Sequence, residues 1–244
     1  MIERKVHIYK TPESLSILLA EKVLNLIEDA INNGKNFNIA VSGGKTPVKV
    51  YQNIARNCAD TEMWVHVNFY WVDERCVLPE HYDSNFRLVY DTLLRHLDIP
   101  DRNIHRIRGE DNPVSEAKRY SGIVRRNIPV ENSWPSFNLV MLGMGSDGHT
   151  ASIFPGQLEL FSSDTICKNT FHPETGQQRI TLTGNVINNA RHIYIMVTGK
   201  DKATILARLF DHKQNNNQYP VYHIRPANGI VEWFIDEEAA KNLT

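Results

Sequence analysis

The chain has 244 residues, of which 41% are hydrophobic and 23% are charged, and its formal net charge is −1. This composition is typical of a globular protein, and the near-zero charge argues against a generally basic nucleic-acid-binding protein while allowing a local cationic pocket. No apolar run approaches the ~20 residues that span a bilayer, and residues 1–10 lack the apolar segment of a signal peptide. We therefore expect a cytoplasmic protein without membrane or nucleic-acid partners.

Hydrophobic periodicity predicts an alternation of strands and helices. In chain order, the predicted strands lie near residues 5–9, 37–41, 65–72, 104–107, 137–142, 179–183, 193–198, 221–224 and 230–235. The predicted helices cover residues 11–34, 47–55, 85–97, 113–128, 202–210 and 237–242. This alternation predicts an α/β protein whose mostly parallel sheet has helices on both faces. No linker is evident, so we expect a single domain over 1–244, with a small subregion near 155–180 that could cover a site.

The three cysteines, Cys58, Cys76 and Cys167, are widely spaced and odd in number. They form no CxxC motif and no Cys/His cluster with zinc spacing, so reduced thiols fit them better than a disulfide framework. We expect Cys76 to have a packing role and expect no metal site.

The most informative segment is FNLVMLGMGSDGHTASIFP at 137–155. A short apolar run breaks there into a glycine-rich loop that carries Asp147 and His149. A carboxylate and an imidazole at the carboxyl end of a strand can form an acid/base pair, because ligands of open α/β sheets bind beyond that end. From these residues alone, an ordinary turn with Asp147 as helix N-cap and His149 on the surface stays open.

A second glycine-rich loop, formed by Ser42, Gly43, Gly44, Lys45 and Thr46, lies between a predicted strand and a predicted helix. Free N–H groups in such a turn and at the helix N-terminus can bind an anion. The loop matches neither the GxxxxGK[ST] phosphate-binding motif nor the GxGxxG dinucleotide motif. A plain strand-to-helix turn is the alternative for this loop taken alone.

Four more charged residues lie beside other predicted strands. Asp73 and Arg75 follow the strand near 65–72, Arg179 opens the strand near 179–183, and Lys202 follows the strand near 193–198. Together with the second glycine-rich loop they could form a cationic pocket for a phosphorylated substrate. Taken singly, each is explained by a structural ion pair or a solvated surface charge.

Taken together and in this order, these motifs resemble those of the 6-phosphogluconolactonase family. The resemblance covers SGGKTP at 42–47, WVDER at 71–75, SN at 84–85, GMGSDGHTASIFP at 143–155, RITLT at 179–183 and VTGKDKA at 197–203. The family commonly has SGGSTP at the first of these, so Lys45 replaces a small polar residue. The resemblance implies a modified Rossmann-type fold of the deaminase/isomerase kind, a phosphorylated sugar lactone as substrate, and no required cofactor.

The resemblance also implies a reaction, the hydrolysis of 6-phospho-D-glucono-1,5-lactone to 6-phospho-D-gluconate in the oxidative pentose phosphate pathway. His149 would be the general base, and Arg75 would bind phosphate or stabilise the oxyanion. Asp147 would lie in the site, where it would orient His149, orient the water or only shape the loop. Residues 42–46, Asp73, Arg179 and Lys202 would bind the substrate. A serine hydrolase is disfavoured because the sequence around Ser146 is GMGSDG rather than GxSxG.

Two alternative functions stay open. Glucosamine-6-phosphate deaminase is similar in fold, but its motif typically continues with Asn-Glu-Pro, whereas this chain has Ile153-Phe154-Pro155, and Phe154 supplies no carboxylate. The deaminase also usually has an aromatic residue at the Arg75 position. A non-catalytic sugar-phosphate sensor is the third function class. The sequence leaves the oligomeric state open.

Overall fold

The computed structural model describes residues 5–57, 62–211, 213–226 and 228–243. Its centre is a seven-stranded sheet with the order β1-β12-β11-β8-β2-β3-β5. Every neighbouring pair in this sheet is parallel. The strands are β1 (Lys5–Tyr9), β2 (Phe37–Val41), β3 (Val67–Trp71), β5 (Ile104–His105), β8 (Leu139–Gly143), β11 (His192–Val197) and β12 (Ile230–Asp236).

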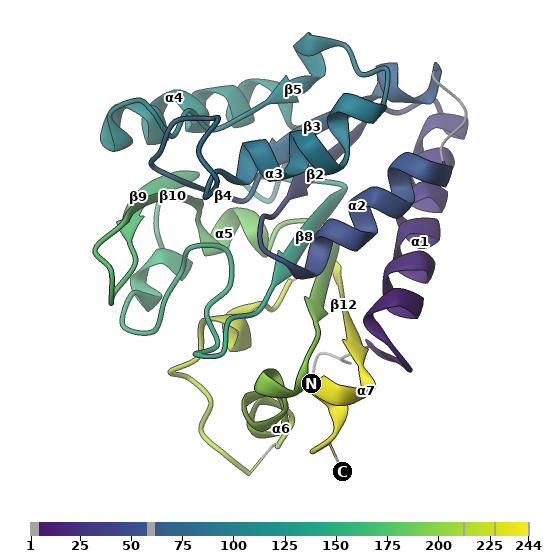
Figure 1. The fold of residues 1–244 in the computed structure, drawn as a ribbon. Helices are drawn as coiled ribbons and strands as arrows, with labels where there is room; N and C mark the ends of the chain where they lie inside the picture. Colours follow the sequence, from purple (N-terminus) through teal and green to yellow (C-terminus); the bar gives the residue numbers. More distant parts are fainter. Residues whose placement is uncertain (1–4, 58–61, 212, 227, 244) are drawn as a thin grey trace.

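Helices cover both faces of the central sheet, as the sequence predicts. They are α1 (Pro12–Asn32), α2 (Thr46–Asn57), α3 (Asn85–Thr92), α4 (Pro113–Asn127), α5 (Gly184–Ile187), α6 (Ala203–Phe210) and α7 (Glu237–Ala240). In Figure 1, α1 and α2 lie to the right of the sheet, and α5 lies to the left of it. All five residues of β2 are buried, which explains why this strand, apart from Asn38, is apolar without alternation.

A smaller antiparallel sheet lies beside the central one and has the order β4-β10-β9. It consists of β4 (Asp73–Arg75), β9 (Cys167–Phe171) and β10 (Gln178–Leu182). Two further short strands, β6 (Val130–Glu131) and β7 (Trp134–Pro135), pair only with each other in the described chain. The segment near 155–180 therefore supplies β9 and the start of β10, while its role as a cover and the single-domain organisation stay predictions.

Two predicted strands differ from the structure. Residues 65 and 66 belong to the 3₁₀ helix Glu62–His66, and residues 73–75 leave the central sheet to pair with β10. Residues 220–223 form the 3₁₀ helix Pro220–His223 instead of a strand. The helix buries Pro220 and Val221, and Ile224, just beyond its end, is buried as well. The buried Val221 and Ile224 are three residues apart, which is the 3₁₀ repeat and not the two-residue repeat of a strand.

Two buried tyrosines satisfy the backbone where the central strands end. The Tyr51 hydroxyl of α2 donates to the Ser42 carbonyl at 2.7 Å and accepts from the Ser42 N–H at 3.2 Å. The Tyr120 hydroxyl of α4 makes the same pair of bonds with Trp71, at 3.0 Å and 2.8 Å. Each hydroxyl thus replaces a strand partner, because Ser42 follows the last paired residue of β2 and the β3–β5 pairing ends at Tyr70, one residue before Trp71.

The topology places the candidate residues together. Strands β11, β8, β2 and β3 are consecutive in the sheet and parallel, so their carboxyl ends lie at one edge. The segments that follow them carry residues 42–46, 73–75, 143–149 and 198–202. These segments are far apart in the sequence and meet only because of the strand order.

Candidate active site

A cavity of about 500 Å³ lies at this edge of the sheet. Ten of the eleven predicted site residues line it, namely Ser42, Gly43, Gly44, Lys45, Thr46, Asp73, Arg75, His149, Arg179 and Lys202. The eleventh, Asp147, does not line the cavity but binds the His149 side chain. The structure thus brings together every residue that the motifs single out.

The His149 ring and the Asp147 carboxylate form a tight pair. His149 Nδ1 lies 2.6 Å from Asp147 Oδ1, which also accepts the His149 backbone N–H at 3.1 Å. Burial alone would raise the pKa of Asp147, but the hydrogen bond and the charge of His149 outweigh it and lower that pKa below its usual value. An ionised Asp147 keeps a proton on Nδ1 and leaves Nε2 as the nitrogen that can accept one.

Two neighbours fix the His149 ring. A Cβ at Gly145 would lie 2.2 Å from His149 Nδ1 and 2.5 Å from Asp147 Oδ1, so only glycine leaves room for the pair. The ring of Phe154 packs against the His149 ring at a centroid distance of 4.8 Å. Phe154 therefore occupies, with an apolar face, the place where the sequence comparison with the deaminase expects a carboxylate.

The loop at residues 42–46 presents both backbone and side-chain groups to the cavity. The Ser42 hydroxyl oxygen is buried and has no hydrogen-bond partner among the described residues. Gly43 approaches Asn85 so closely that a Cβ would lie 1.8 Å from the Asn85 amide oxygen. Gly44 has a φ of +92°, a conformation that other residues rarely adopt. At the end of the loop, the Thr46 hydroxyl lies 3.1 Å from that of Thr198.

Two arginines line the cavity as cross-strand partners. Arg75 of β4 lies opposite Arg179 of β10 in the antiparallel register. The Nε atoms of both are buried and, within the described chain, lack a hydrogen-bond partner, although Arg75 Nη1 donates to the Asp83 carbonyl at 2.7 Å. Burial, followed by the charge of Arg75, lowers the pKa of Arg179. Two adjacent cations with free donors favour a bound anion at this wall.

Asp73 is held within a small buried network. Its carboxylate accepts from the Ser152 hydroxyl at 2.6 Å and from the Asn85 amide at 3.3 Å. The same amide donates to the Asp73 carbonyl at 2.9 Å. Asn85 lines the cavity and Ser152 is fully buried. Both lie inside the motifs SN and HTAS, but their partners are far away in the sequence, so the motifs alone did not single them out.

Lys202 reaches the cavity from the segment after β11. Its side chain is 18% exposed, and its ammonium lies 3.1 Å from the Asp201 carboxylate, which is 66% exposed. The chain turns there at Gly199, whose φ is +95° and whose N–H donates to the Asp236 carboxylate at 3.0 Å. The cavity is therefore lined by positive groups both from the segment after β11 and from the small sheet.

Metal-binding and membrane-spanning features are absent from the described residues. In the described ranges, no group of three or more His, Cys, Asp or Glu side chains could hold a metal ion. Cys76 and Cys167 are free thiols, and Cys58 lies outside the described residues. None of the described helices combines the length and apolar character needed to cross a bilayer.

The model of the glucosamine-6-phosphate isomerase/6-phosphogluconolactonase family matches residues 10–233. The chain belongs to this family. It is 37% identical over 203 residues to a 6-phosphogluconolactonase of Treponema pallidum, covering 83% of both chains. A 6-phosphogluconolactonase of Haemophilus influenzae is 39% identical over 206 residues, which cover 84% of this chain and 87% of the relative. The solved structure of 6-phosphogluconolactonase from Trypanosoma brucei has a TM-score of 0.88 and 26% identity over the full length of both chains.

Proposed function

We infer that this chain hydrolyses 6-phospho-D-glucono-1,5-lactone to 6-phospho-D-gluconate. The relatives named 6-phosphogluconolactonase support this activity at high coverage. The observation that carries the inference is the His149–Asp147 pair, at 2.6 Å, beside a cavity that also holds two arginines with free donors. Such a cavity provides a base for activating water and positive charge for a phosphorylated ester, and the reaction belongs to the oxidative pentose phosphate pathway.

In the proposed mechanism, His149 is the general base. Asp147 holds the proton on Nδ1, and Nε2 takes a proton from a water as the water oxygen bonds to C1 of the lactone. The carbonyl oxygen gains negative charge, and its collapse breaks the bond between C1 and the ring oxygen. The ring oxygen then takes the proton from His149, which gives the acid and a free hydroxyl group.

In the same mechanism, the positively charged residues bind the phosphate group and neutralise negative charge. Arg179, Lys202 and the N–H groups of residues 42–46 bind the phosphate group, and the buried Ser42 hydroxyl donates to it. Arg75 neutralises either the phosphate or the oxyanion, and Arg75→Lys separates these roles. A rise in KM alone indicates phosphate binding, whereas a fall in kcat at unchanged KM indicates oxyanion stabilisation. Asp73 lines the same cavity and binds substrate hydroxyl groups.

An assay of the purified chain tests the activity. Release of acid from the phosphorylated lactone should exceed the spontaneous rate measured without enzyme, and glucosamine 6-phosphate should release no ammonia. Turnover of the amino sugar would favour the deaminase, and binding of the lactone without turnover would favour a sensor. The packing of Phe154 on His149 favours the lactonase over the deaminase, because it leaves no carboxylate at that position.

Several expectations about the environment stay predictions. A cytoplasmic location, the absence of nucleic-acid partners and the absence of a required cofactor follow from the composition or from the resemblance. The proposed mechanism is consistent with the absence of a required cofactor, since its proton transfers and charge neutralisation use side chains of this chain.

A further inference from the structure

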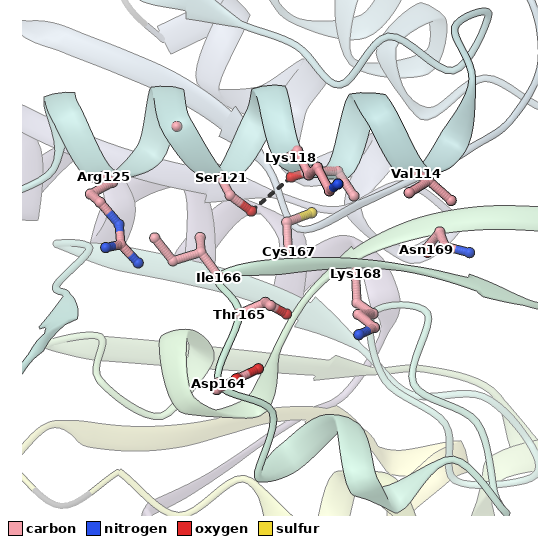
Figure 2. Close-up of a pocket in the computed structure, with 12 residues that line it drawn as sticks. Val114, Lys118, Ser121, Arg125, Asp164, Thr165, Ile166, Cys167, Lys168 and Asn169 are labelled. Atoms are coloured by element: carbon pink, nitrogen blue, oxygen red, sulfur yellow. Dashed lines mark hydrogen bonds between the residues drawn. The ribbon is translucent and has the colours of Figure 1, made fainter.

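A second hollow lies between helix α4 and strand β9, away from the active cavity. It has a volume of about 380 Å³, and none of the described residues lines both this hollow and that cavity. One side is a stripe along α4, and the other is the continuous segment 164–169 (Figure 2). The stripe consists of Val114, Ala117, Lys118, Ser121, Gly122 and Arg125. We call this hollow the α4–β9 groove.

The floor of the groove is apolar. Ile166, Cys167 and Ala117 are buried, with exposed fractions of 1%, 3% and 5%. The groove is open above them because the facing positions of α4, Ser121 and Gly122, carry small side chains, and the Ser121 hydroxyl is turned to the Ala117 carbonyl at 2.7 Å. When an apolar group binds to this floor, both the group and the floor lose contact with water, and this burial stabilises binding.

The rim of the groove is positively charged. Lys118, Arg125 and Lys168 are exposed lining residues, and none of them has an ion-pair partner within the described ranges. Among the described residues that line the groove, only Asp164 is acidic. In Figure 2, Arg125 and Lys168 extend on either side of Ile166 and Thr165. The groove therefore combines an apolar floor with an excess of two positive charges.

We propose that the α4–β9 groove binds a small organic anion with an apolar body, whose carboxylate or phosphate group pairs with Arg125 and Lys168. The volume lies within the range of about 300–1,000 Å³ that small-molecule sites occupy. Arg125 offers planar paired donors and Lys168 a point charge, so both anionic groups suit the rim. The phosphorylated lactone fits poorly, because its hydroxyl groups would meet the apolar floor. The site is thus distinct from the proposed substrate site and does not depend on the proposed reaction.

The first test measures binding of three naphthalene probes to the full chain. 1-Naphthoate and 1-naphthyl phosphate carry the two anionic groups, and 1-naphthamide is the neutral counterpart. Calorimetry gives each Kd, and the NMR signals of the Ile166 methyl groups report contact with the floor. We expect at least one anion to bind tenfold more tightly than the amide and to shift the Ile166 signals. Which anion binds more tightly then identifies the occupant as a carboxylate or a phosphate ester.

The second test removes positive charges from the rim of the groove and fills the groove with a larger side chain. Arg125→Gln and Lys168→Gln should each weaken binding of the anion about tenfold, whereas Arg126→Gln, a neighbouring exposed arginine outside the lining, should not. Ser121→Leu should fill the groove and abolish binding while lactone hydrolysis is unchanged. Equal affinity for the anions and the amide, unshifted Ile166 signals, or an equal loss in Arg126→Gln would overturn the proposal. Binding in the active cavity would leave the Ile166 signals unshifted and the affinity unchanged in all three glutamine variants, and would likewise overturn the proposal.

Discussion

At the scale of single residues, the proposed chemistry depends on one imidazole with a fixed proton. His149→Ala should lower kcat by about 10²–10⁴, the usual effect of removing a general base. The fold should survive, because the His149 side chain is about one-third exposed and packs mainly on Phe154. Initial rates, corrected for spontaneous hydrolysis, measure the effect, and thermal unfolding provides the control. A folded variant with near-normal kcat would remove His149 from the mechanism.

The space around this imidazole allows a sharper test with a matched pair of glycines. Gly145→Ala should displace the His149–Asp147 pair and lower kcat about 10²-fold, because the new Cβ would lie 2.2 Å from His149 Nδ1. Gly143→Ala is the control, since a Cβ there meets no atom within 4 Å. Both variants add one methyl group to a residue that lines the cavity, at the last residue of β8 or in the loop that follows it. Equal kcat values in the two would show that the geometry of the pair is not limiting.

At the scale of elements, a buried carboxylate joins strand β4 to helix α3. The Glu74 side chain accepts the N–H groups of Arg75, Asn85 and Phe86 at 2.7–2.8 Å. Two of these donors are the first residues of α3, so Glu74 holds the helix start against the strand that carries Asp73 and Arg75. Burial nevertheless raises the pKa of Glu74 from 4.5 to about 7.

This shift predicts a pH dependence of stability. Between pH 4.5 and pH 7 the folded state binds more protons at Glu74 than the unfolded state, so the free energy of unfolding should fall as the pH rises through that window. The fall should be at most about 3–4 kcal/mol, since the pKa of Glu74 is raised from 4.5 to about 7 and one pKa unit corresponds to ~1.4 kcal/mol. Urea unfolding of the parent chain and of Glu74→Gln at pH 5 and pH 8 isolates this effect. An identical pH dependence in the two proteins would contradict it.

The strands and loops also show which features of the fold a local sequence pattern predicts and which it does not. Strand ends and glycine-rich loops have local signatures, so the sequence predicted the strands around 37–41 and 137–142 and the residues at their carboxyl ends. The pairing of Arg75 with Arg179 joins residues about a hundred positions apart, and no local pattern encodes it. The same holds for Asn85 and Ser152, which bind Asp73 across the fold. Strand β9 went unrecognised because its sequence, CKNTF, lacks a continuous apolar run.

At the scale of the whole molecule, the positively charged residues that line the cavity come from separate parts of the chain. Replacing Lys202 tests whether one of them recognises the phosphate group. Lys202→Ala should raise KM for the phosphorylated lactone about 10- to 100-fold, the range expected for losing a charged hydrogen bond. Hydrolysis of unphosphorylated D-glucono-1,5-lactone should be unchanged. Lys200→Ala is the control, because Lys200 is exposed, lies in the same 3₁₀ turn and does not line the cavity. An equal effect on both lactones would exclude phosphate recognition by Lys202.

The two buried tyrosines at the strand ends, Tyr51 and Tyr120, affect how well the fold tolerates substitution. Where parallel strands separate to make room for a ligand, the exposed backbone would attract water or another strand. Here the Tyr51 and Tyr120 hydroxyls pair with the backbone groups of Ser42 and Trp71, so these strand ends need neither water nor another strand as a partner. Replacing tyrosine by phenylalanine removes only a hydroxyl group and usually changes stability little. At positions 51 and 120 it would leave a buried N–H and a buried carbonyl unpaired, each costing about 1–3 kcal/mol.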